Sequence, residues 1–367
     1  MTDMADRLRV LVVGPAPAGA LSRGGMATVA AMMAAHPDDR FAVTVVPTYV
    51  DGPLHRRLAT GVRGMLCATW VLLCRRADVL HVHLAHGGSV VRKALPLAAA
   101  RLAGVPAVVH GHSYDFGGWF DRLPHVAKHV VRRLLVADQW LVLGKRHIEE
   151  YAYRLQLSDR RIDVLPNAVQ IPDVAVNQSG DESVHAVAVG RLGERKGSYD
   201  VIAAIGVLDE AVRARLRVTL AGDGDVEQVR AAVAAADLTG RIDVPGWMDS
   251  AARDELLGSA HIFLLPSRDE GLPMALLEAM AYGLVPVTTT VGSIGEVVTD
   301  GLTGVVVRPG CPAEIADVLT ALVDDDTLRA RLGVAARGRA RHFGLDGWYE
   351  RLGQLWMQLA GDRPVLR

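Results

Sequence analysis

Residues 266–283 read Pro-Ser-Arg-Asp-Glu-Gly-Leu-Pro-Met-Ala-Leu-Leu-Glu-Ala-Met-Ala-Tyr-Gly. The stretch begins with a polar turn directly after an apolar run, Ile262–Leu265, and continues as an apolar helical pattern over Met274–Tyr282. A second apolar run, Val285–Thr289, follows at once. Strand, turn, helix and strand in this order form the βαβ unit of a parallel sheet. The stretch therefore predicts an α/β fold.

Short apolar runs alternate with helical patterns along the whole chain. Most runs are continuous in Val, Leu and Ile, which is typical of parallel strands buried on both faces. Two such series predict a bilobed protein with two parallel sheets. The other expected strands are Arg9–Gly14, Ala42–Pro47, Val79–His83, Ala107–His110, Trp140–Leu143, Ile162–Leu165, His185–Val189, Arg217–Ala221, Ile242–Val244 and Gly304–Val307. Further expected helices are Ala27–Ala35, Gln228–Ala236 and Gly347–Leu359.

Charge divides the chain into two parts. Residues 1–172 hold 21 Lys+Arg against 13 Asp+Glu, a net charge of +8, and the remainder holds 19 against 28, a net of −9. The polar segment Asp173–Ser183 has the composition of a linker. We expect an N-terminal Rossmann-like domain over 1–172 and a C-terminal Rossmann-like domain over 184–345. A last helical segment, 346–367, is expected to pack back on the first domain.

Composition excludes several classes of protein. The 367 residues are half apolar, enough for two cores, and include three cysteines, Cys67, Cys74 and Cys311. Three cysteines are too few, and odd in number, for a disulfide framework or a zinc ribbon. This low cysteine content suits a reducing cytosol. The charged start, Met1–Arg9, leads into a strand, so no secretory signal is expected. No apolar run reaches the roughly 18 residues of a transmembrane helix. These features predict a cytoplasmic protein.

A loop rich in glycine and cations follows the first strand of the second half. It reads Gly190-Arg-Leu-Gly-Glu-Arg-Lys-Gly197 and places Arg191 and Lys196 at the carboxyl end of a strand, where α/β folds bind ligands. Arginine can fork onto the oxygens of a diphosphate, and lysine acts as a point charge. A solvated basic turn is the alternative interpretation.

Two glutamates flank a helix that should start near Pro273, a natural first-turn residue. Glu270 would lie in the loop before the helix and Glu278 on the helix itself. A carboxylate is a good partner for a vicinal diol, so both could grip sugar hydroxyls. Alternatively, Glu270 caps the helix and Glu278 is an ordinary surface residue. The exposed N–H groups at the helix start would belong to Leu272, Met274 and Ala275.

These motifs together resemble family 4 glycosyltransferases, of the group 1 type seen in polysaccharide biosynthesis. The resemblance covers nearly the whole second half and is looser in the first. It implies a GT-B fold, two Rossmann-like domains facing across a cleft, with a nucleotide-sugar donor on the second domain and retention of anomeric configuration. The segments that carry it are Gly190-Arg-Leu, Lys196-Gly, Gly222-Asp-Gly224, residues 266–283, Pro286-Val, Gly24-Gly25, His81-Val-His83, His110-Gly-His112 and Val164-Leu-Pro-Asn167.

By position in the family's motifs, Arg191 and Lys196 would clamp the diphosphate, Glu278 would hold the ribose and Glu270 the transferred sugar. His112 would hydrogen-bond near the reacting carbon, with His110 as its rival. The full donor-binding set is Gly24, Gly25, Arg191, Lys196, Trp247, Glu270, Gly271, Leu272, Pro273, Met274 and Glu278. The catalytic set is His112, Glu270, Arg191 and Lys196. Trp247 would border the base, and ordinary packing is its alternative.

No metal and no cofactor are expected. Asp223-Gly-Asp225 has the spelling of a metal-binding Asp-x-Asp motif but sits in a turn after a strand, and Asp324–Asp326 is typical of a helix cap. His81 and His83 point to one face of a strand, without carboxylates at a ligand spacing. Cations and N–H dipoles would instead stabilise the leaving diphosphate. Attack on the leaving-group side, assisted by a diphosphate oxygen, is the working mechanism.

The acceptor is less clearly encoded. His55–Arg76 and Arg122–Leu135 are basic amphipathic stretches that suit an anionic membrane surface at the inner face of the membrane. They favour a saccharide acceptor, lipid-linked, in polysaccharide or cell-wall glycan synthesis, with no nucleic-acid partner. Both stretches could instead pack in the domain with their arginines outward. A nucleotide-sugar epimerase or hydrolase of the same fold and a small soluble acceptor, such as an antibiotic intermediate, stay open, as does the choice of UDP- or GDP-sugar.

Overall fold

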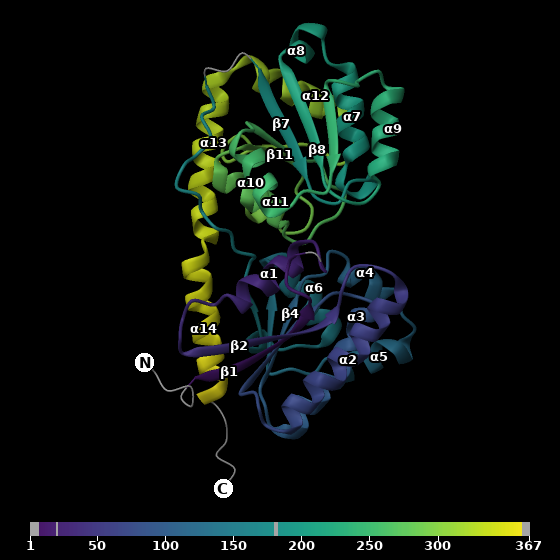
Figure 1. Cartoon of the computed structure of the whole chain (residues 1–367), viewed down its shortest axis with the longest axis vertical. Helices are drawn as coiled ribbons and strands as arrows, with labels where there is room; N and C mark the ends of the chain where they lie inside the picture. Colours follow the sequence, from purple (N-terminus) through teal and green to yellow (C-terminus); the bar gives the residue numbers. More distant parts are fainter. Residues whose placement is uncertain (1–6, 20, 180–182, 362–367) are drawn as a thin grey trace. The chain divides into compact units, whose positions relative to one another are not determined.

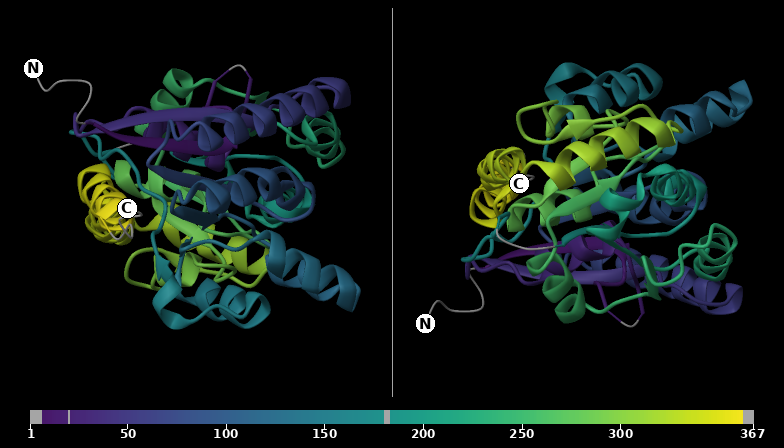
Figure 2. Two further views of the ribbon diagram at one scale, coloured as in Figure 1. Left: turned by 90° about the horizontal axis from the view of Figure 1, so that it is seen from below. Right: turned by 90° about the horizontal axis from the view of Figure 1, so that it is seen from above.

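The computed structural model describes residues 7–19, 21–179 and 183–361. Its contacts divide the chain into two compact units. The first unit contains residues up to Asn167 together with the segment from Asp346 onward, and the second contains Ala168–Leu345. Each unit is a parallel sheet with helices on both faces (Figures 1 and 2). The predicted α/β fold with two Rossmann-like domains is confirmed.

The first unit holds a six-stranded parallel sheet in the order β2-β1-β3-β4-β5-β6. This is the flavodoxin-like order with one strand added. Its strands are β1 Leu8–Pro15, β2 Phe41–Tyr49, β3 Val79–Leu84, β4 Ala107–Gly111, β5 Gln139–Val142 and β6 Ile162–Val164. Its helices are α1 Gly25–Ala34, α2 Leu54–Leu73, α3 Gly88–Ala103, α4 Phe116–Asp121, α5 His125–Leu134, α6 Lys145–Leu155 and α14 Leu345–Gly361.

The second unit also has six parallel strands, in the order β12-β11-β10-β7-β8-β9. Counted from β7, this is the order 3-2-1-4-5-6 of dinucleotide-binding folds. Its strands are β7 Val184–Val189, β8 Leu216–Ala221, β9 Ile242–Gly246, β10 Ile262–Leu265, β11 Val285–Thr288 and β12 Val305–Val306. Its helices are α7 Ser198–Val207, α8 Glu210–Ala214, α9 Val226–Ala235, α10 Ser250–Gly258, α11 Met274–Tyr282, α12 Pro312–Asp324 and α13 Asp326–Ala340.

Helix α14 packs on the first unit, although the second unit precedes it in the chain. The Tyr349 hydroxyl donates to the carbonyl of Met32 at 2.9 Å, and Trp356 Nε1 donates to His81 Nδ1 at 3.2 Å. Trp356 is fully buried. The helix therefore completes the core on one face of the first sheet, opposite the face that α2 and α3 cover.

Helix α2 packs on β2 through small residues. A Cβ atom added to Gly64 would overlap the carbonyl oxygen of Pro47, so only glycine allows this approach. The buried positions Gly61, Gly64 and Ala68 recur every three or four residues, as expected for one helix face. The opposite face of α2 is consequently left to solvent.

The segment Asp173–Ser183 differs from the linker that its composition predicts. The side-chain amide of Gln178 donates to the carbonyls of His261 and Gly283, at 3.0 and 2.8 Å. Arg329 in turn donates to the carbonyl of Gln178 at 3.1 Å. Residues 173–179 are thus fastened to the second unit, and residues 180–182 lie outside the described part, as do residues 1–6 of the charged start. None of the described helices has both the length and the apolarity to cross a membrane.

Candidate functional site

The strand order of the second sheet reverses between β7 and β10, which lie side by side. In open α/β sheets, ligands bind at such a reversal, beyond the carboxyl ends of the two strands. The loop after β7 is Gly190–Gly197, and the loop after β10 is Pro266–Pro273. The two stretches that the sequence singles out therefore lie at the expected place.

A buried ion pair joins the two loops. The ammonium of Lys196 contacts Oε1 of Glu270, and the two side chains are only 16% and 7% exposed. The hydroxyl of Ser267 donates to the same Oε1 at 2.8 Å, and Arg195 lies 3.7 Å from it. Burial lowers the pKa of Lys196, and the Glu270 carboxylate opposes that shift. The two predicted residues are brought together as partners.

Arg191 is exposed and has no hydrogen bond or ion pair with any residue in the described ranges. It lines a small hollow at the end of β7 together with Gly190, Lys196 and Leu265. A guanidinium left without a carboxylate partner beside a buried ammonium is suited to an incoming anion with several oxygens.

Close backbone approach holds the two loops in register. Gly197 has a φ of 74°. A Cβ there would lie 2.5 Å from the carbonyl oxygen of Pro266. Gly292, with a φ of 59°, likewise packs against the backbone of Glu270 so closely that a side chain would overlap it. Glycine is required at both positions, and both requirements serve the loop that carries Glu270.

Glu278 lies on α11, largely buried, with its Oε1 3.4 Å from the guanidinium of Arg253. Burial raises the pKa of this carboxyl, and Arg253 partly offsets that effect. The alternative that Glu278 is an ordinary surface residue is wrong. The alternative that Glu270 caps the helix is also wrong, because the N-cap is Pro273 and no side chain accepts a capping hydrogen bond there.

The remaining predicted donor-binding residues of this unit fall into two groups. Gly271, Leu272, Pro273 and Met274 are buried directly before or at the start of α11. Trp247 follows β9 and is 45% exposed. The two Asp-rich motifs lie at helix starts: Asp225 is the N-cap residue of α9 and makes no side-chain capping bond, whereas Asp325 caps α13 by accepting from the N–H of Leu328 at 2.8 Å.

In the first unit, the strand order reverses between β1 and β3. Gly24 and Gly25 lie at the start of α1, after β1, and Gly24 has a φ of 91°. His83 lies near the end of β3, and His112 directly follows β4, with its N–H bonded to the carbonyl of Leu84 at 2.8 Å. The predicted residues of this unit therefore also gather at the carboxyl edge of their sheet.

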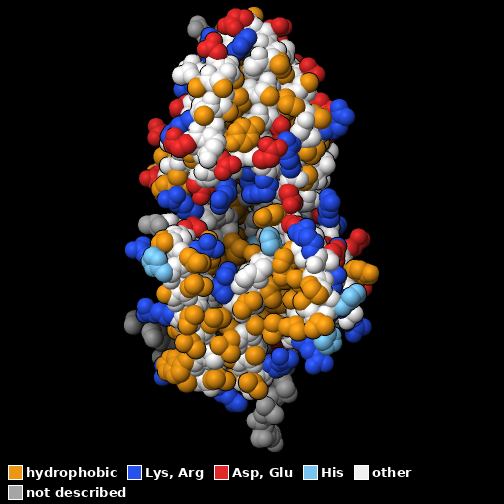
Figure 3. All heavy atoms as spheres, turned by 90° about the vertical axis from the view of Figure 1, so that its right-hand side faces the viewer, with side chains coloured by type: hydrophobic (Ala, Val, Ile, Leu, Met, Phe, Trp, Pro, Cys, Tyr) orange, Lys and Arg blue, Asp and Glu red, His pale blue; other side chains and the backbone are white. Residues whose placement is uncertain are grey.

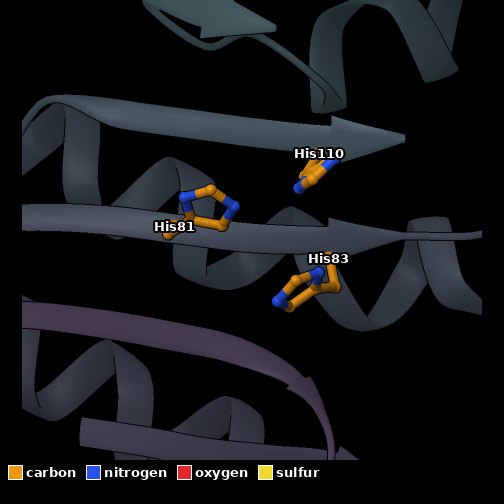
Figure 4. Close-up of side chains that lie close together, drawn as sticks. All are labelled: His81, His83 and His110. Atoms are coloured by element: carbon orange, nitrogen blue, oxygen red, sulfur yellow. The ribbon is translucent and has the colours of Figure 1, made fainter. Parts of the chain in front are cut away.

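Four histidines share one face of this sheet. His81 and His83 come from β3, and His110 and His112 from the neighbouring β4, with His83 directly opposite His110. Figure 4 shows the rings of His81, His83 and His110 together, with ring nitrogens of His81 and His110 turned toward one another. His81, His83 and His110 are fully buried, whereas His112 is partly exposed.

Burial keeps these rings neutral. It lowers the pKa of His110 to about 4 and holds the pKa values of His81, His83 and His112 well below the usual value. One nitrogen of each of His81, His83 and His110 lies within 4.8 Å of the others, a spacing from which three imidazoles could reach a metal ion. The sequence predicts no metal site here, and that expectation remains a prediction.

Residues 171–339 match the family described as glycosyl transferases group 1. The second unit is a group 1 glycosyltransferase domain. The whole chain is 27% identical over 328 residues to alpha-D-kanosaminyltransferase of Streptomyces kanamyceticus, an alignment that covers 80% of this chain and 81% of that protein.

Its fold matches solved glycosyltransferase structures. Sucrose-phosphate synthase of Thermosynechococcus elongatus gives a TM-score of 0.78 at 17% identity, covering 96% of this chain and 99% of that one. HepE of Anabaena, in complex with UDP-glucose, gives 0.73 at 16% identity, covering 96% and 100%. These matches confirm the GT-B fold, and the predicted enzyme class is confirmed by the family match. Membership of family 4 and retention of configuration stay predictions.

Two features of the sites were missed at the sequence level. The grouping of His110 with His81 and His83 depends on the pairing of β3 with β4, which periodicity does not give. The Lys196–Glu270 pair depends on β7 lying beside β10. The histidine group and the ion pair can be predicted from the sequence only if the strand order is assumed first.

Proposed function

We propose that the glycosyltransferase transfers a hexosyl unit from a nucleoside diphosphate sugar, UDP- or GDP-linked, to a saccharide acceptor. Transfer proceeds with retention of configuration and without a metal ion. The observation that carries the proposal is the strand reversal of the second unit, where Arg191, Lys196 and Glu270 converge beside the start of α11. The solved complex of HepE with UDP-glucose supports a donor of this class.

The chemistry follows from charge. As the bond to the sugar breaks, negative charge grows on the diphosphate, and groups that meet it there stabilise the transition state more than the ground state. Arg191 supplies a forked cation, Lys196 a buried ammonium, and the first turn of α11 supplies N–H groups without helical partners. Ser267, Lys196 and Arg195 all approach Oε1 of Glu270, which leaves Oε2 to accept from a sugar hydroxyl.

A thermal-shift screen of UDP-, GDP- and ADP-sugars tests donor binding, because a ligand that binds the folded state raises the melting temperature. One class of donor is expected to raise it, and Arg191→Ala and Lys196→Ala are expected to abolish the shift. Arg241→Ala is the matched control: the same charge is removed in the same unit, just before β9, at the opposite edge of the sheet. Donor binding retained in both site variants would refute the clamp.

The mechanism has its own test. Attack assisted by a diphosphate oxygen leaves no covalent sugar on the protein, so mass spectrometry after rapid quenching should find the unmodified mass. A trapped glycosyl–enzyme would replace this mechanism with a double displacement through a carboxylate. Release of nucleotide from donor alone, as fast as with acceptor, would favour the epimerase or hydrolase alternative.

We further propose that the acceptor is carried at an anionic membrane surface, to which the first unit binds through α2. Six large apolar side chains lie at intervals of three or four residues on the solvent side of this helix and are between 52% and 66% exposed. Contiguous exposed apolar area of this kind marks an interaction surface. The members of this apolar stripe are Leu54, Leu58, Val62, Leu66, Trp70 and Leu73.

Basic side chains surround the stripe. Figure 3 shows hydrophobic side chains gathered on one face of the first unit, with Lys, Arg and His side chains around them. The guanidinium of Arg76 lies 4.5 Å from the ring centre of Trp70. An apolar face bordered by cations is typical of helices that lie in the interface of an anionic bilayer. The exposed arginines on and after α2 are Arg56, Arg57, Arg63, Arg75 and Arg76.

Liposome flotation tests this surface. The wild-type protein should float with phosphatidylglycerol vesicles, and the double variant Leu58→Glu/Leu66→Glu should remain at the bottom. Leu302→Glu/Val334→Glu is the matched control, since these side chains are also exposed but belong to the second unit. A wild-type protein that does not float removes the membrane proposal. The similarity to an alpha-D-kanosaminyltransferase would then favour the second candidate, a small soluble acceptor.

A further inference from the structure

The four histidines of the first sheet contain two rings whose protonated nitrogen follows from their partners. The indole N–H of Trp356 can only donate, so His81 accepts at Nδ1 and a neutral His81 carries its proton on Nε2. The carbonyl of Leu165 can only accept, so His110 donates from Nε2 and Nδ1 is bare. Both assignments are independent of any ligand.

These two rings complement one another. Nε2 of His81 and Nδ1 of His110 are buried and have no hydrogen-bond partner among the described residues. One is a donor and the other an acceptor, and the ring centres lie 5.6 Å apart. A proton on Nε2 also stops a neutral His81 from offering that nitrogen to a metal ion, which argues against a three-histidine metal site.

The third ring, His83, contacts His112: Nδ1 of His83 lies 2.8 Å from Nε2 of His112. Either ring could be the donor. If His112 donated, His83 would carry its own proton on Nε2, which is buried without a partner in the described ranges. An unsatisfied N–H group in a protein interior is rare, and His81 already leaves one on its Nε2, so a second one on His83 would add to that cost.

The surroundings of His83 favour the same choice. Burial is the main cause of the lowered pKa of His83, and the neighbouring rings and Lys93 lower it further, so the ring stays neutral and carries one proton. Nδ1 is its only nitrogen with a hydrogen-bond partner among the described residues. His83 therefore donates from Nδ1.

We propose that His83 is a positioning residue for His112: its Nδ1–H donates to Nε2 of His112 and holds His112 as the neutral tautomer with a proton on Nδ1. His112 then presents a hydrogen-bond donor and no free basic nitrogen at the carboxyl edge of the sheet. The value of this to catalysis rests on the proposed sugar transfer and on the role that the family resemblance implies for His112, a hydrogen bond near the reacting carbon, for which a donor is needed and a base is not.

Nuclear magnetic resonance tests the proposal without activity or ligand. Long-range ¹⁵N–¹H correlation spectra of protein labelled with ¹⁵N-histidine show which nitrogen of each ring is protonated. At pH 7 we expect protons on Nδ1 of His83 and His112 and on Nε2 of His81 and His110. A proton on Nε2 of His112 would overturn the proposal, whether or not the protein transfers sugar.

Substitution sharpens the test. His83→Leu removes the donor, so His112 should exchange between tautomers and its two nitrogen signals should average. His83→Asn, whose amide nitrogen can replace Nδ1, should restore the wild-type pattern. His110→Leu is the matched control, because its ring centre lies 4.1 Å from that of His112 without a hydrogen bond to it. An unchanged His112 spectrum in His83→Leu would contradict the positioning role.

The metal alternative has a separate outcome. Dialysis of the wild-type protein against Zn²⁺, followed by elemental analysis, should find no equivalent of zinc that His110→Asn removes. Zinc bound in such an amount would mean that His81 gives up its Nε2 proton, and the proposed tautomer set would be wrong.

Discussion

The two units place opposite kinds of chemistry at equivalent positions. In the second unit, the reversal of strand order holds fixed charges: Lys196 and Glu270 as a buried pair, with Arg191 exposed beside them. In the first unit, the corresponding edge holds imidazoles that burial keeps neutral. One edge is suited to a strongly charged leaving group and the other to neutral hydroxyls. Two sheets of similar architecture thus carry side chains of opposite character at the same edge.

The largest effect should come from breaking the charge pair of the second unit. Lys196→Met leaves the carboxylate of Glu270 buried without its main partner, and losing one member of a buried pair costs about 3–5 kcal/mol of unfolding free energy. The double variant Lys196→Met/Glu270→Gln should recover most of this loss. Chemical denaturation of the three proteins measures the coupling. Additive effects in the double variant would mean that the pair is energetically silent.

The next effect should come from the glycine that joins the two loops. Gly197→Ala forces a side chain into a left-handed backbone conformation and against the carbonyl of Pro266, which together cost about 3 kcal/mol. Donor binding should weaken as Lys196 moves. Gly206→Ala, where a Cβ meets open space, is the control. Equal melting temperatures for both variants would show that the loops are not held by this contact.

A fall in pH should destabilise the first unit more than the second. The buried histidines of the first unit are neutral when folded but gain protons when unfolded, so their contribution is complete above a pH of about 6.5 and is lost as the pH falls toward 4. His110, with a pKa of about 4, alone accounts for about 2 kcal/mol between pH 7 and 5.

The stability of the second unit should change less with pH, because its titrating groups have effects of opposite sign. Burial lowers the pKa of His185 to about 4, which gives the same sign as His110, but the raised pKa of Glu278 favours folding as the pH falls. Hydrogen exchange by mass spectrometry, corrected for the intrinsic effect of pH, should show faster opening of the first unit at pH 5. Equal acceleration in both units would contradict this account.

The smallest effect should come from Gly14, near the end of β1 in the first unit. A Cβ at Gly14 would lie 2.9 Å from Cδ2 of His83, a side-chain atom rather than a backbone atom. Gly14→Ala should therefore cost only about 1 kcal/mol in thermal unfolding. It should nevertheless displace the His83 ring, which the histidine spectra would register. A histidine spectrum of Gly14→Ala identical to that of the wild type would show that the His83 ring is not displaced by the added methyl group.

Local pattern was enough for the fold but not for the contacts between strands. Continuous runs such as Val79–His83 and Ile262–Leu265 predict strands because both faces are buried, and the structure has them there. The same logic failed at Asp173–Ser183, where a polar composition hides the buried amide of Gln178. Polar residues look alike in a sequence whether their hydrogen bonds go to water or to backbone carbonyls.

The site followed the same rule. Arg191, Lys196 and Glu270 could be chosen because glycine-rich loops after strands are typical ligand loops. The ion pair between Lys196 and Glu270 could not be predicted, because the two residues are 74 positions apart in the sequence and meet only through the strand order. The tautomers of His81 and His110 could not be predicted either, because they depend on hydrogen bonds with Trp356 and with the carbonyl of Leu165.

Because α14 belongs to the first unit, that unit is made of two separated pieces of chain, whereas the second unit is one uninterrupted piece. During synthesis, the amino-terminal sheet must wait for Trp356 to leave the ribosome before His81 finds its donor. The first unit can therefore be completed only after the whole second unit has been synthesised, unlike an amino-terminal domain made of one continuous segment. Loss of α14 alone would leave the chain of the second unit whole and would remove the buried Trp356 from the first unit.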